Sequence, residues 1–200
     1  MSQPASVKPL ATYEDLKLVP DHLVAEILEG ELFATPRPAL PHAHAGSALG
    51  IEIGGPFGHG RGGPGGWWIL DEPELHLQQD VVVPDLAGWR RERLPTTFAD
   101  AAFMTLAPDW VCEILSPSTE QMDRSRKLRI YAREAVSWVW LVNPIVRTLE
   151  ILRLEAGRWV LVDTHAGEQE VHAEPFEAIV LELSRIWPPL ATPAPESHRR

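Results

Sequence analysis

The spacing of hydrophobic and polar residues divides the first quarter of the chain into a short helix, a hairpin and a second helix. Thr12 offers a cap for a helix that starts beside it. Two apolar runs over residues 23–33 are joined at Glu29-Gly30 and are typical of a β-hairpin. Three prolines then interrupt the chain, and the apolar spacing of residues 42–53 fits a helix that contains two glycines.

A glycine-rich segment and several strand patterns follow. Residues 54–66 are predicted to form a loop. A phosphate-binding loop is the alternative, but its Gly-Lys-Ser/Thr ending and a following helix pattern are missing. Residues 90–108 are predicted to form a polar crossing, a segment that connects two strands. Short apolar runs predict successive strands at residues 67–70, 74–77, 81–83, 86–89 and 109–115.

The second half of the chain has the pattern of one helix followed by strands. Ser118 and Gln121 stand at the spacing of a capping box and predict a helix over residues 120–134. An apolar strand is predicted at residues 136–142, and a hairpin turns around Glu155-Ala-Gly157. This order predicts an α/β fold with a mixed central sheet flanked by helices.

Composition sets the expected size and setting of this fold. The chain has 200 residues, 44% of them hydrophobic, which suits one domain over residues 1–187. The proline-rich residues 188–200 are predicted to be a disordered tail. Cys112 is the single cysteine, so no disulfide can form within the chain. Without a signal pattern or a long apolar run, we expect a soluble protein of the reducing cytoplasm.

Net charge weakens the case for a protein that grips nucleic acid with its whole surface. The formal net charge is −10 at pH 7, whereas phosphate binding is normally supplied by clustered Lys and Arg. Basic residues do cluster locally, and these clusters soften the objection. They are Arg90, Arg91 and Arg93 in one segment and Arg124, Arg126, Lys127 and Arg129 in another.

Two acidic residues stand where an apolar strand pattern would bury them. Asp85 follows Val81-Val82-Val83 and a proline, and Glu113 lies within the apolar run 109–115. A buried carboxylate is costly unless it meets a metal, a cation or several hydrogen-bond donors. Mg²⁺ and Mn²⁺ prefer hard oxygen ligands and usually take only one or two carboxylates. Asp85 and Glu113, on strands that could lie side by side, match this demand.

Lys127 is a candidate partner for these acids. Asp123, Lys127 and Tyr131 recur every four residues, so they share one face of the predicted helix. If that face packs over the ends of the two strands, the ammonium reaches the acids and can orient water or stabilise a phosphate. The alternative is that Asp123 and Lys127 form an ordinary surface ion pair, worth roughly 0.3–0.5 kcal/mol.

Other candidate residues have simpler interpretations. His42, His44 and His76 lack the cysteine partners and the spacing of a zinc site. Ser116 and Ser118 lack a Gly-x-Ser-x-Gly elbow and are interpreted as caps. Tryptophans could stack on bases, but Trp138 and Trp140 share a strand face, where packing in the core is the favoured interpretation.

Several strings together resemble the Uma2 family of predicted endonucleases, which is assigned to the restriction-endonuclease-like PD-(D/E)XK superfamily. The resemblance covers roughly residues 12–185, in the range where one domain is expected. Its motifs are Glu26-Ile-Leu-Glu-Gly-Glu-Leu, His42 after a proline-rich turn, Val-Pro-Asp85-Leu, Val-Cys-Glu113-Ile-Leu-Ser-Pro-Ser-Thr, the helical Asp123, Lys127 and Tyr131, and Val136-Ser-Trp-Val-Trp-Leu-Val-Asn-Pro.

The resemblance implies a restriction-endonuclease-like core with additional N-terminal and C-terminal hairpins, and a Mg²⁺- or Mn²⁺-dependent DNA endonuclease activity. It makes Asp85 the Asp of the PD motif and Glu113 the first residue of the E-x-K motif, both of them metal ligands. Leu115 stands where the superfamily has its lysine, so Lys127 is the candidate replacement. Fold analogy also implies a homodimer, so that both strands of DNA are cut.

The resemblance also suggests supporting residues. Glu26, His42, Asp123 and Tyr131 could bind the metal through water or orient another ligand, and each could equally be structural. Glu52 is a further acid from the first core helix. Two other functions stay open: a catalytically weak member that acts as a nucleic-acid-binding or dimerisation module, and a metal-dependent hydrolase of smaller phosphodiesters.

Overall fold

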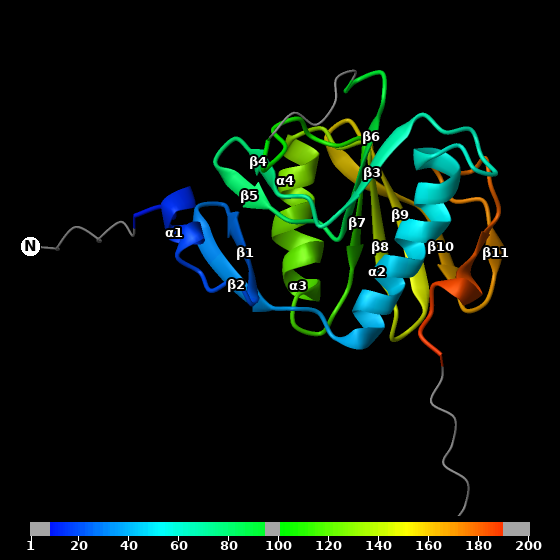
Figure 1. Cartoon of the computed structure of the whole chain (residues 1–200), viewed down its shortest axis with the longest axis horizontal. Coiled ribbons are helices and arrows are strands. Elements are labelled where there is room, and N and C mark those ends of the chain that lie inside the picture. Colours follow the sequence, from blue (N-terminus) through cyan, green and yellow to red (C-terminus); the bar gives the residue numbers. More distant parts are fainter. Residues whose placement is uncertain (1–8, 95–100, 190–200) are drawn as a thin grey trace, which may run out of the picture.

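The structure, a computed structural model, describes residues 9–94 and 101–189 and is built around a six-stranded mixed sheet (Figure 1). The predicted tail therefore lies outside the described residues from residue 190 onward, as do residues 95–100 of the predicted polar crossing. Along the sheet the order is β10-β9-β8-β7-β6-β3, and only β7 and β8 are parallel. The strands are β3 (Trp67–Asp71), β6 (Leu86–Arg90), β7 (Trp110–Ile114), β8 (Trp138–Asn143), β9 (Thr148–Glu155) and β10 (Arg158–Ala166).

A second, four-stranded sheet has the order β2-β1-β5-β4. The predicted N-terminal hairpin is present as β1 (Leu23–Leu28) and β2 (Glu31–Pro36). Its partner is a second hairpin, β4 (Leu75–Leu77) and β5 (Asp80–Val82), which joins β1 at the pair Ile27 and Val81. Two of the predicted strands thus belong to this small sheet, which lies beside the central sheet in Figure 1.

The N-terminal helices agree with the pattern, but the glycine-rich segment does not. Thr12 caps helix α1 (Tyr13–Lys17) as predicted, and the structure adds a capping box with Asp15; helix α2 is Leu40–Ile53. The expectation of a loop from residue 54 is wrong at its start, because a π-helical turn, η1 (Gly54–Gly58), continues α2. The amide of His59 donates to the carbonyl of Gly54 at 3.0 Å and closes this turn. Backbone hydrogen bonding therefore extends the helix through residues with low helix propensity.

The helix predicted over residues 120–134 is present but not uniform. It comprises α3 (Glu120–Met122), a π-helical turn η2 (Asp123–Lys127) and α4 (Leu128–Arg133). The predicted capping box is wrong: Thr119 is the N-cap residue without a side-chain cap bond, and the Ser118 hydroxyl lies 3.0 Å from that of Ser116. This helix connects the parallel strands β7 and β8, a connection that requires a crossover.

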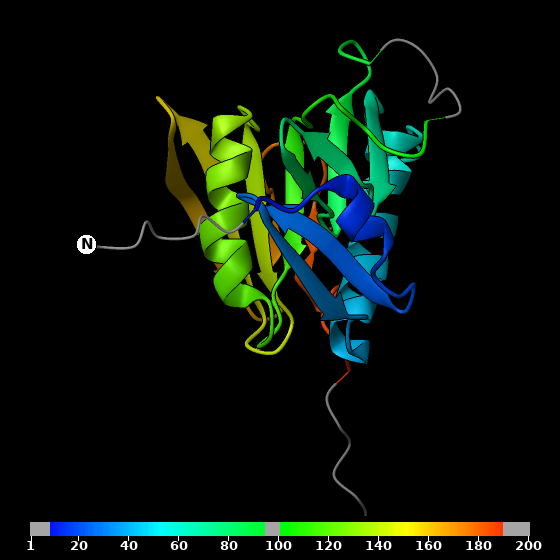
Figure 2. The same cartoon turned by 90° about the vertical axis from the view of Figure 1, so that its left-hand side faces the viewer.

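The two faces of the central sheet carry separate hydrophobic layers, and helices lie on opposite sides of it (Figure 2). On β7, Trp110, Cys112 and Ile114 belong to the layer that includes α2, whereas Val111 belongs to the layer that includes α4. Because side chains alternate along a strand, Glu113 shares the face of Val111. The strand thus presents Glu113 towards the helix that carries Lys127.

The C-terminal part of the chain completes the first of these layers. Beyond the predicted hairpin β9–β10, the short strands β11 (Glu170–Val171) and β12 (Leu181–Glu182) pair with each other, and a 3₁₀ turn, η3 (Leu183–Arg185), follows. Phe176 packs edge-on against Trp140, which is fully buried, so the core interpretation of this tryptophan is confirmed. No helix in the described ranges is both long enough and apolar enough to cross a membrane.

Candidate active site

The strand that follows Asp85 and the strand that carries Glu113 are neighbours, as the sequence predicts. Strand β6 begins directly after Asp85 and pairs with β7 in a register that sets Leu86 opposite Cys112. The main-chain amide of Ile114 donates to Asp85 Oδ2 at 2.6 Å. This bond holds one oxygen of the Asp85 carboxylate against β7 and leaves Oδ1 directed elsewhere.

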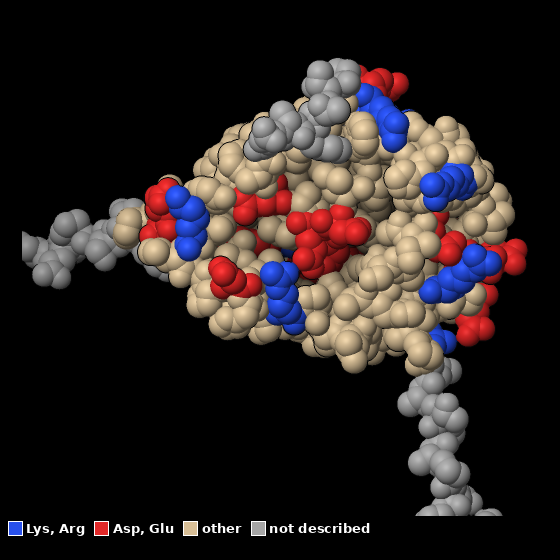
Figure 3. Space-filling view, in the orientation of Figure 1, with Lys and Arg blue, Asp and Glu red and all other residues tan. Residues whose placement is uncertain are grey.

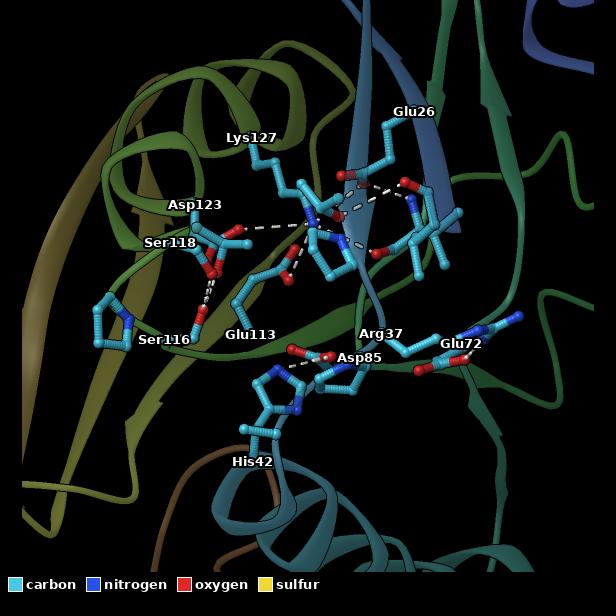
Figure 4. A pocket seen from close by; sticks show the side chains of 18 residues that line it. Glu26, Arg37, His42, Glu72, Asp85, Glu113, Ser116, Ser118, Asp123 and Lys127 are labelled. Carbon is cyan, nitrogen blue, oxygen red and sulfur yellow. Dashed lines mark hydrogen bonds and ion pairs between the residues drawn. The ribbon is translucent and has the colours of Figure 1, made fainter. Parts of the chain in front are cut away.

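Lys127 lies at the centre of the acidic group rather than on the surface. Its side chain is only 5% exposed, and Nζ lies 3.2 Å from Glu113 Oε2, 3.0 Å from Glu26 Oε1 and 3.6 Å from Asp123 Oδ1 (Figure 4). It also donates to the carbonyl oxygen of Val83 at 3.2 Å. The alternative of an ordinary surface ion pair is therefore wrong.

Glu26 and Tyr131 enclose this group from two further elements. Glu26 extends from β1 of the small sheet, is 4% exposed, and accepts a hydrogen bond from the amide of Val83 at 2.8 Å. The Tyr131 hydroxyl, from α4, donates to Glu113 Oε1 at 2.5 Å. Both oxygens of Glu113 thus have a partner, Tyr131 on one and Lys127 on the other.

Burial and charge shift the ionisation of this group in a consistent direction. Burial raises the pKa of Glu113 well above its usual range, against the opposing effect of Lys127, and the neighbouring acids raise it further. Asp123 has a raised pKa for the same reason. Burial alone would lower the pKa of Lys127, but the surrounding carboxylates outweigh it and raise the pKa well above normal. The ammonium is therefore strongly retained, and the site favours added positive charge.

His42 extends from the first turns of α2 to the same acids. Its Nε2 lies 3.2 Å from Asp85 Oδ1, and its side chain is 14% exposed. Burial opposes protonation of His42, but the hydrogen bond and the charge of Asp85 outweigh it, so the net pKa is raised. His42 is therefore part of the acidic group.

The four acids, Lys127 and His42 line a pocket of about 320 Å³ that is open to solvent. Acidic side chains gather in a hollow at the middle of one face of the molecule (Figure 3). Ser116 and Ser118 lie on one side of the acids, and Arg37 and Glu72 lie on the other (Figure 4). Sequence reasoning missed Arg37 and Glu72, because Arg37 stands between two prolines and Glu72 before another, and no local motif distinguishes either residue.

Other predicted residues lie outside the acidic group. Glu52 pairs with Arg185 at 3.5 Å and does not line the pocket. The basic cluster of the helix is neutralised by neighbouring acids and offers no free basic patch. Its ion pairs are Arg124 with Glu120 and Glu150, Arg126 with Glu31 and Glu29, and Arg129 with Glu29.

The donor set fits a hard divalent cation. Asp85 and Glu113 supply carboxylate oxygens, and four carboxylates face only one ammonium and one imidazole. Within the described ranges, no three His, Cys, Asp or Glu side chains converge as a complete ligand set. Mg²⁺ does not require one, because it usually keeps several waters and takes one or two carboxylates. Asp85 and Glu113 are the residues that could hold it.

Comparisons with known proteins agree with the fold. A solved structure described as a putative nuclease belonging to DUF820, from Anabaena variabilis, superimposes with a TM-score of 0.72 at 21% sequence identity. The match covers 88% of this chain and 97% of that one. None of the curated proteins matches the chain. Residues 10–184 match the profile of Uma2, described as "Putative restriction endonuclease". The resemblance in the sequence is thus confirmed, and the chain belongs to the Uma2 family.

Proposed function

We propose that this protein is a metal-dependent endonuclease that hydrolyses phosphodiester bonds of DNA, with Mg²⁺ or Mn²⁺ held by Asp85 and Glu113. The observation that carries the proposal is a buried ammonium surrounded by three carboxylates, with the Asp85 carboxylate beside His42 in the same open pocket. A nuclease fold and membership of Uma2 support a nucleic-acid substrate. The excess of negative charge at the site supports a bound cation.

When bound, the divalent ion would lower the pKa of a water molecule and offset charge on the phosphate. The chain positions the carboxylates for this chemistry. The amide of Ile114 fixes Asp85 Oδ2, and Tyr131 fixes Glu113 Oε1, so Asp85 Oδ1 and Glu113 Oε2 are presented in defined directions. Such preorganisation reduces the reorganisation that the reaction requires.

Lys127 takes the role that Leu115 cannot perform. Leu115 is 1% exposed and packs in the hydrophobic layer, whereas Lys127 Nζ lies against Glu113 Oε2. From this position the ammonium holds the Glu113 carboxylate and favours negative charge on a phosphate oxygen in the pocket. Glu26 and Asp123 hold Lys127 in turn, so we assign them a positioning role.

His42 is the side chain nearest to the remaining oxygen of Asp85. Its raised pKa follows from that carboxylate, and a protonated His42 would donate to Asp85 Oδ1. We therefore assign His42 to orienting Asp85, as a partner that keeps a ligand in one rotamer.

The test is cleavage of supercoiled plasmid in the presence of Mg²⁺, Mn²⁺ or EDTA. We expect metal-dependent nicking by the wild type and its loss in Asp85→Asn and Glu113→Gln, both with an unchanged circular dichroism spectrum. Glu52→Gln is the matched control, because Glu52 carries the same charge outside the pocket. Undiminished nicking by either pocket variant would refute the assignment.

A nucleic-acid-binding or dimerisation module is the second candidate. It is favoured by the ion pairs that occupy Lys127 and by Leu115 at the position of the superfamily's lysine. Salt-dependent DNA binding without nicking under any metal condition would support this function instead. On fold analogy we also propose a homodimer, which sedimentation of the purified protein tests. The single cysteine supports a location in the reducing cytoplasm.

A further inference from the structure

The rim of the pocket carries an arginine that its neighbours hold only loosely. Arg37 follows β2, and its side chain is 58% exposed. Its Nη1 lies 3.3 Å from Glu72 Oε2, and its Nη2 donates to the carbonyl of Asp21 at 3.5 Å. Both distances are long for charge-assisted bonds, which are typically about 2.7–2.9 Å.

Other arginines near the site are held by shorter bonds. Arg124 contacts Glu150 at 2.7 and 2.8 Å, and Arg129 contacts Glu29 at 2.9 Å through two nitrogens. Of the described residues that line the pocket, the only Lys and Arg are Lys127 and Arg37. Because Lys127 is buried among carboxylates, Arg37 is the more accessible of the two to an entering anion.

Glu72, the competitor for Arg37, has an unusual backbone. Its φ angle is +43°, a left-handed conformation that is uncommon for residues with a side chain. The amide of Glu72 donates to the carbonyl oxygen of Asp85 at 3.0 Å. One residue therefore connects the backbone of a proposed metal ligand with the charge of Arg37. Non-glycine residues in such conformations gather at functional sites.

We propose that Arg37 binds a backbone phosphate of the nucleic acid beside the bond to be cleaved, and that Glu72 holds Arg37 in competition with that phosphate. This inference rests on the proposed function. The opposite side of the pocket offers the neutral hydroxyls of Ser116 and Ser118, so positive charge is presented from the side of Arg37 (Figure 4). A guanidinium can bind a phosphate in a bidentate manner, whereas its contact with Glu72 is a single one.

The expected effect follows from counterion release. One phosphate contact contributes about 0.9 to the slope of log affinity against log salt. We take the contribution of this contact to the DNA affinity to be zero at about 1 M salt. Loss of the contact then weakens DNA binding roughly 15-fold at about 50 mM salt and about 4-fold at about 200 mM salt. Removing the competing charge of Glu72 should tighten binding by up to about 5-fold, the size of a typical exposed ion pair.

The experiment measures the affinity of the full chain for a short fluorescent DNA duplex across a salt series with Mg²⁺. Phosphorothioate linkages keep the charge and resist cleavage. We expect Arg37→Ala to reduce the salt slope by about one, Arg37→Lys to retain it, and Glu72→Gln to tighten binding. Arg158→Ala is the matched control, because Arg158 is exposed on β10 and does not line the pocket.

The outcomes distinguish a failure of this inference from a failure of the proposed function. Wild-type binding with the same slope in Arg37→Ala and Arg158→Ala would overturn the role of Arg37 and leave the endonuclease proposal standing. Weaker binding by Glu72→Gln would contradict the competition. Absence of binding by the wild type at low salt would overturn both proposals.

Discussion

Replacing Lys127 by methionine should destabilise the protein by about 3–5 kcal/mol, the usual cost of removing one partner from a buried ion pair. Methionine keeps much of the apolar side chain but removes the charge that Glu26, Glu113 and Asp123 face within 3.6 Å. For a chain of 200 residues, each kcal/mol corresponds to about 2–4 °C in Tm, so the shift should be roughly 6–20 °C.

The pH dependence of this loss identifies its cause. Glu113 and Asp123 already have raised pKa values in the folded protein, and removal of Lys127 takes away an effect that lowers both. A carboxyl group whose pKa is higher in the folded state takes up its proton there first, so the folded variant gains stability as pH falls through that pKa. The deficit of Lys127→Met should therefore be smaller at acidic than at alkaline pH.

Urea unfolding in EDTA, followed by tryptophan fluorescence at several pH values, measures this deficit without metal. Lys17→Met is the matched control, because Lys17 pairs with Glu14 on the surface, and it should change stability by no more than about 0.5 kcal/mol. Lys127→Met combined with Glu113→Gln should recover part of the loss. If Lys127→Met alone were as stable as the wild type at neutral pH, the reasoning would be refuted.

Three further predictions concern neighbouring parts of the structure. Tyr131→Phe leaves Glu113 Oε1 without its donor and should cost about 1–3 kcal/mol in urea unfolding; an unchanged midpoint would contradict the bond. Gly88→Ala should lower the free energy of unfolding by about 1–3 kcal/mol in the same assay, because a Cβ there would lie 3.0 Å from Ile69 and 3.1 Å from Trp110. Unchanged stability would contradict this steric conflict. Mg²⁺ at about 100 times its Kd should stabilise the wild type by about 2.7 kcal/mol and Asp85→Asn by less; an equal thermal shift in both would argue against Asp85 as a ligand.

The local pattern of hydrophobic residues was sufficient to predict most of the strands and helices, because each element has its own hydrophobic spacing. The apolar run over residues 109–115 predicts a strand that contains Glu113, and Asp85 directly follows another apolar run. The hydrogen bond from the Ile114 amide to Asp85 shows that the two acids are brought close together. The assignment of strands to two sheets was not predictable. The small sheet depends on a single pair, Ile27 and Val81, between hairpins far apart in the chain.

Which residues form the site was easier to predict from the sequence than how deeply they are buried. A shared helix face brings Asp123 and Lys127 together in sequence, but only packing of that face against β1 and β7 buries the ammonium. Likewise, the contact of Arg37 with Glu72 joins residues 35 positions apart, and neither stands in a recognisable motif. Such contacts follow from tertiary structure, which local spacing does not encode.

The π-helical turn at Asp123–Lys127 has a consequence for how this site can change in evolution. A π turn holds one residue more than the α turn that it replaces, and such turns are frequent at functional sites. Deleting one residue there would restore an α-helix and rotate all later side chains by about 100° about its axis. Tyr131 would then turn away from Glu113 with every acid still present. Among relatives, a one-residue gap at this turn should therefore mark loss of the site even where each of its side chains is retained.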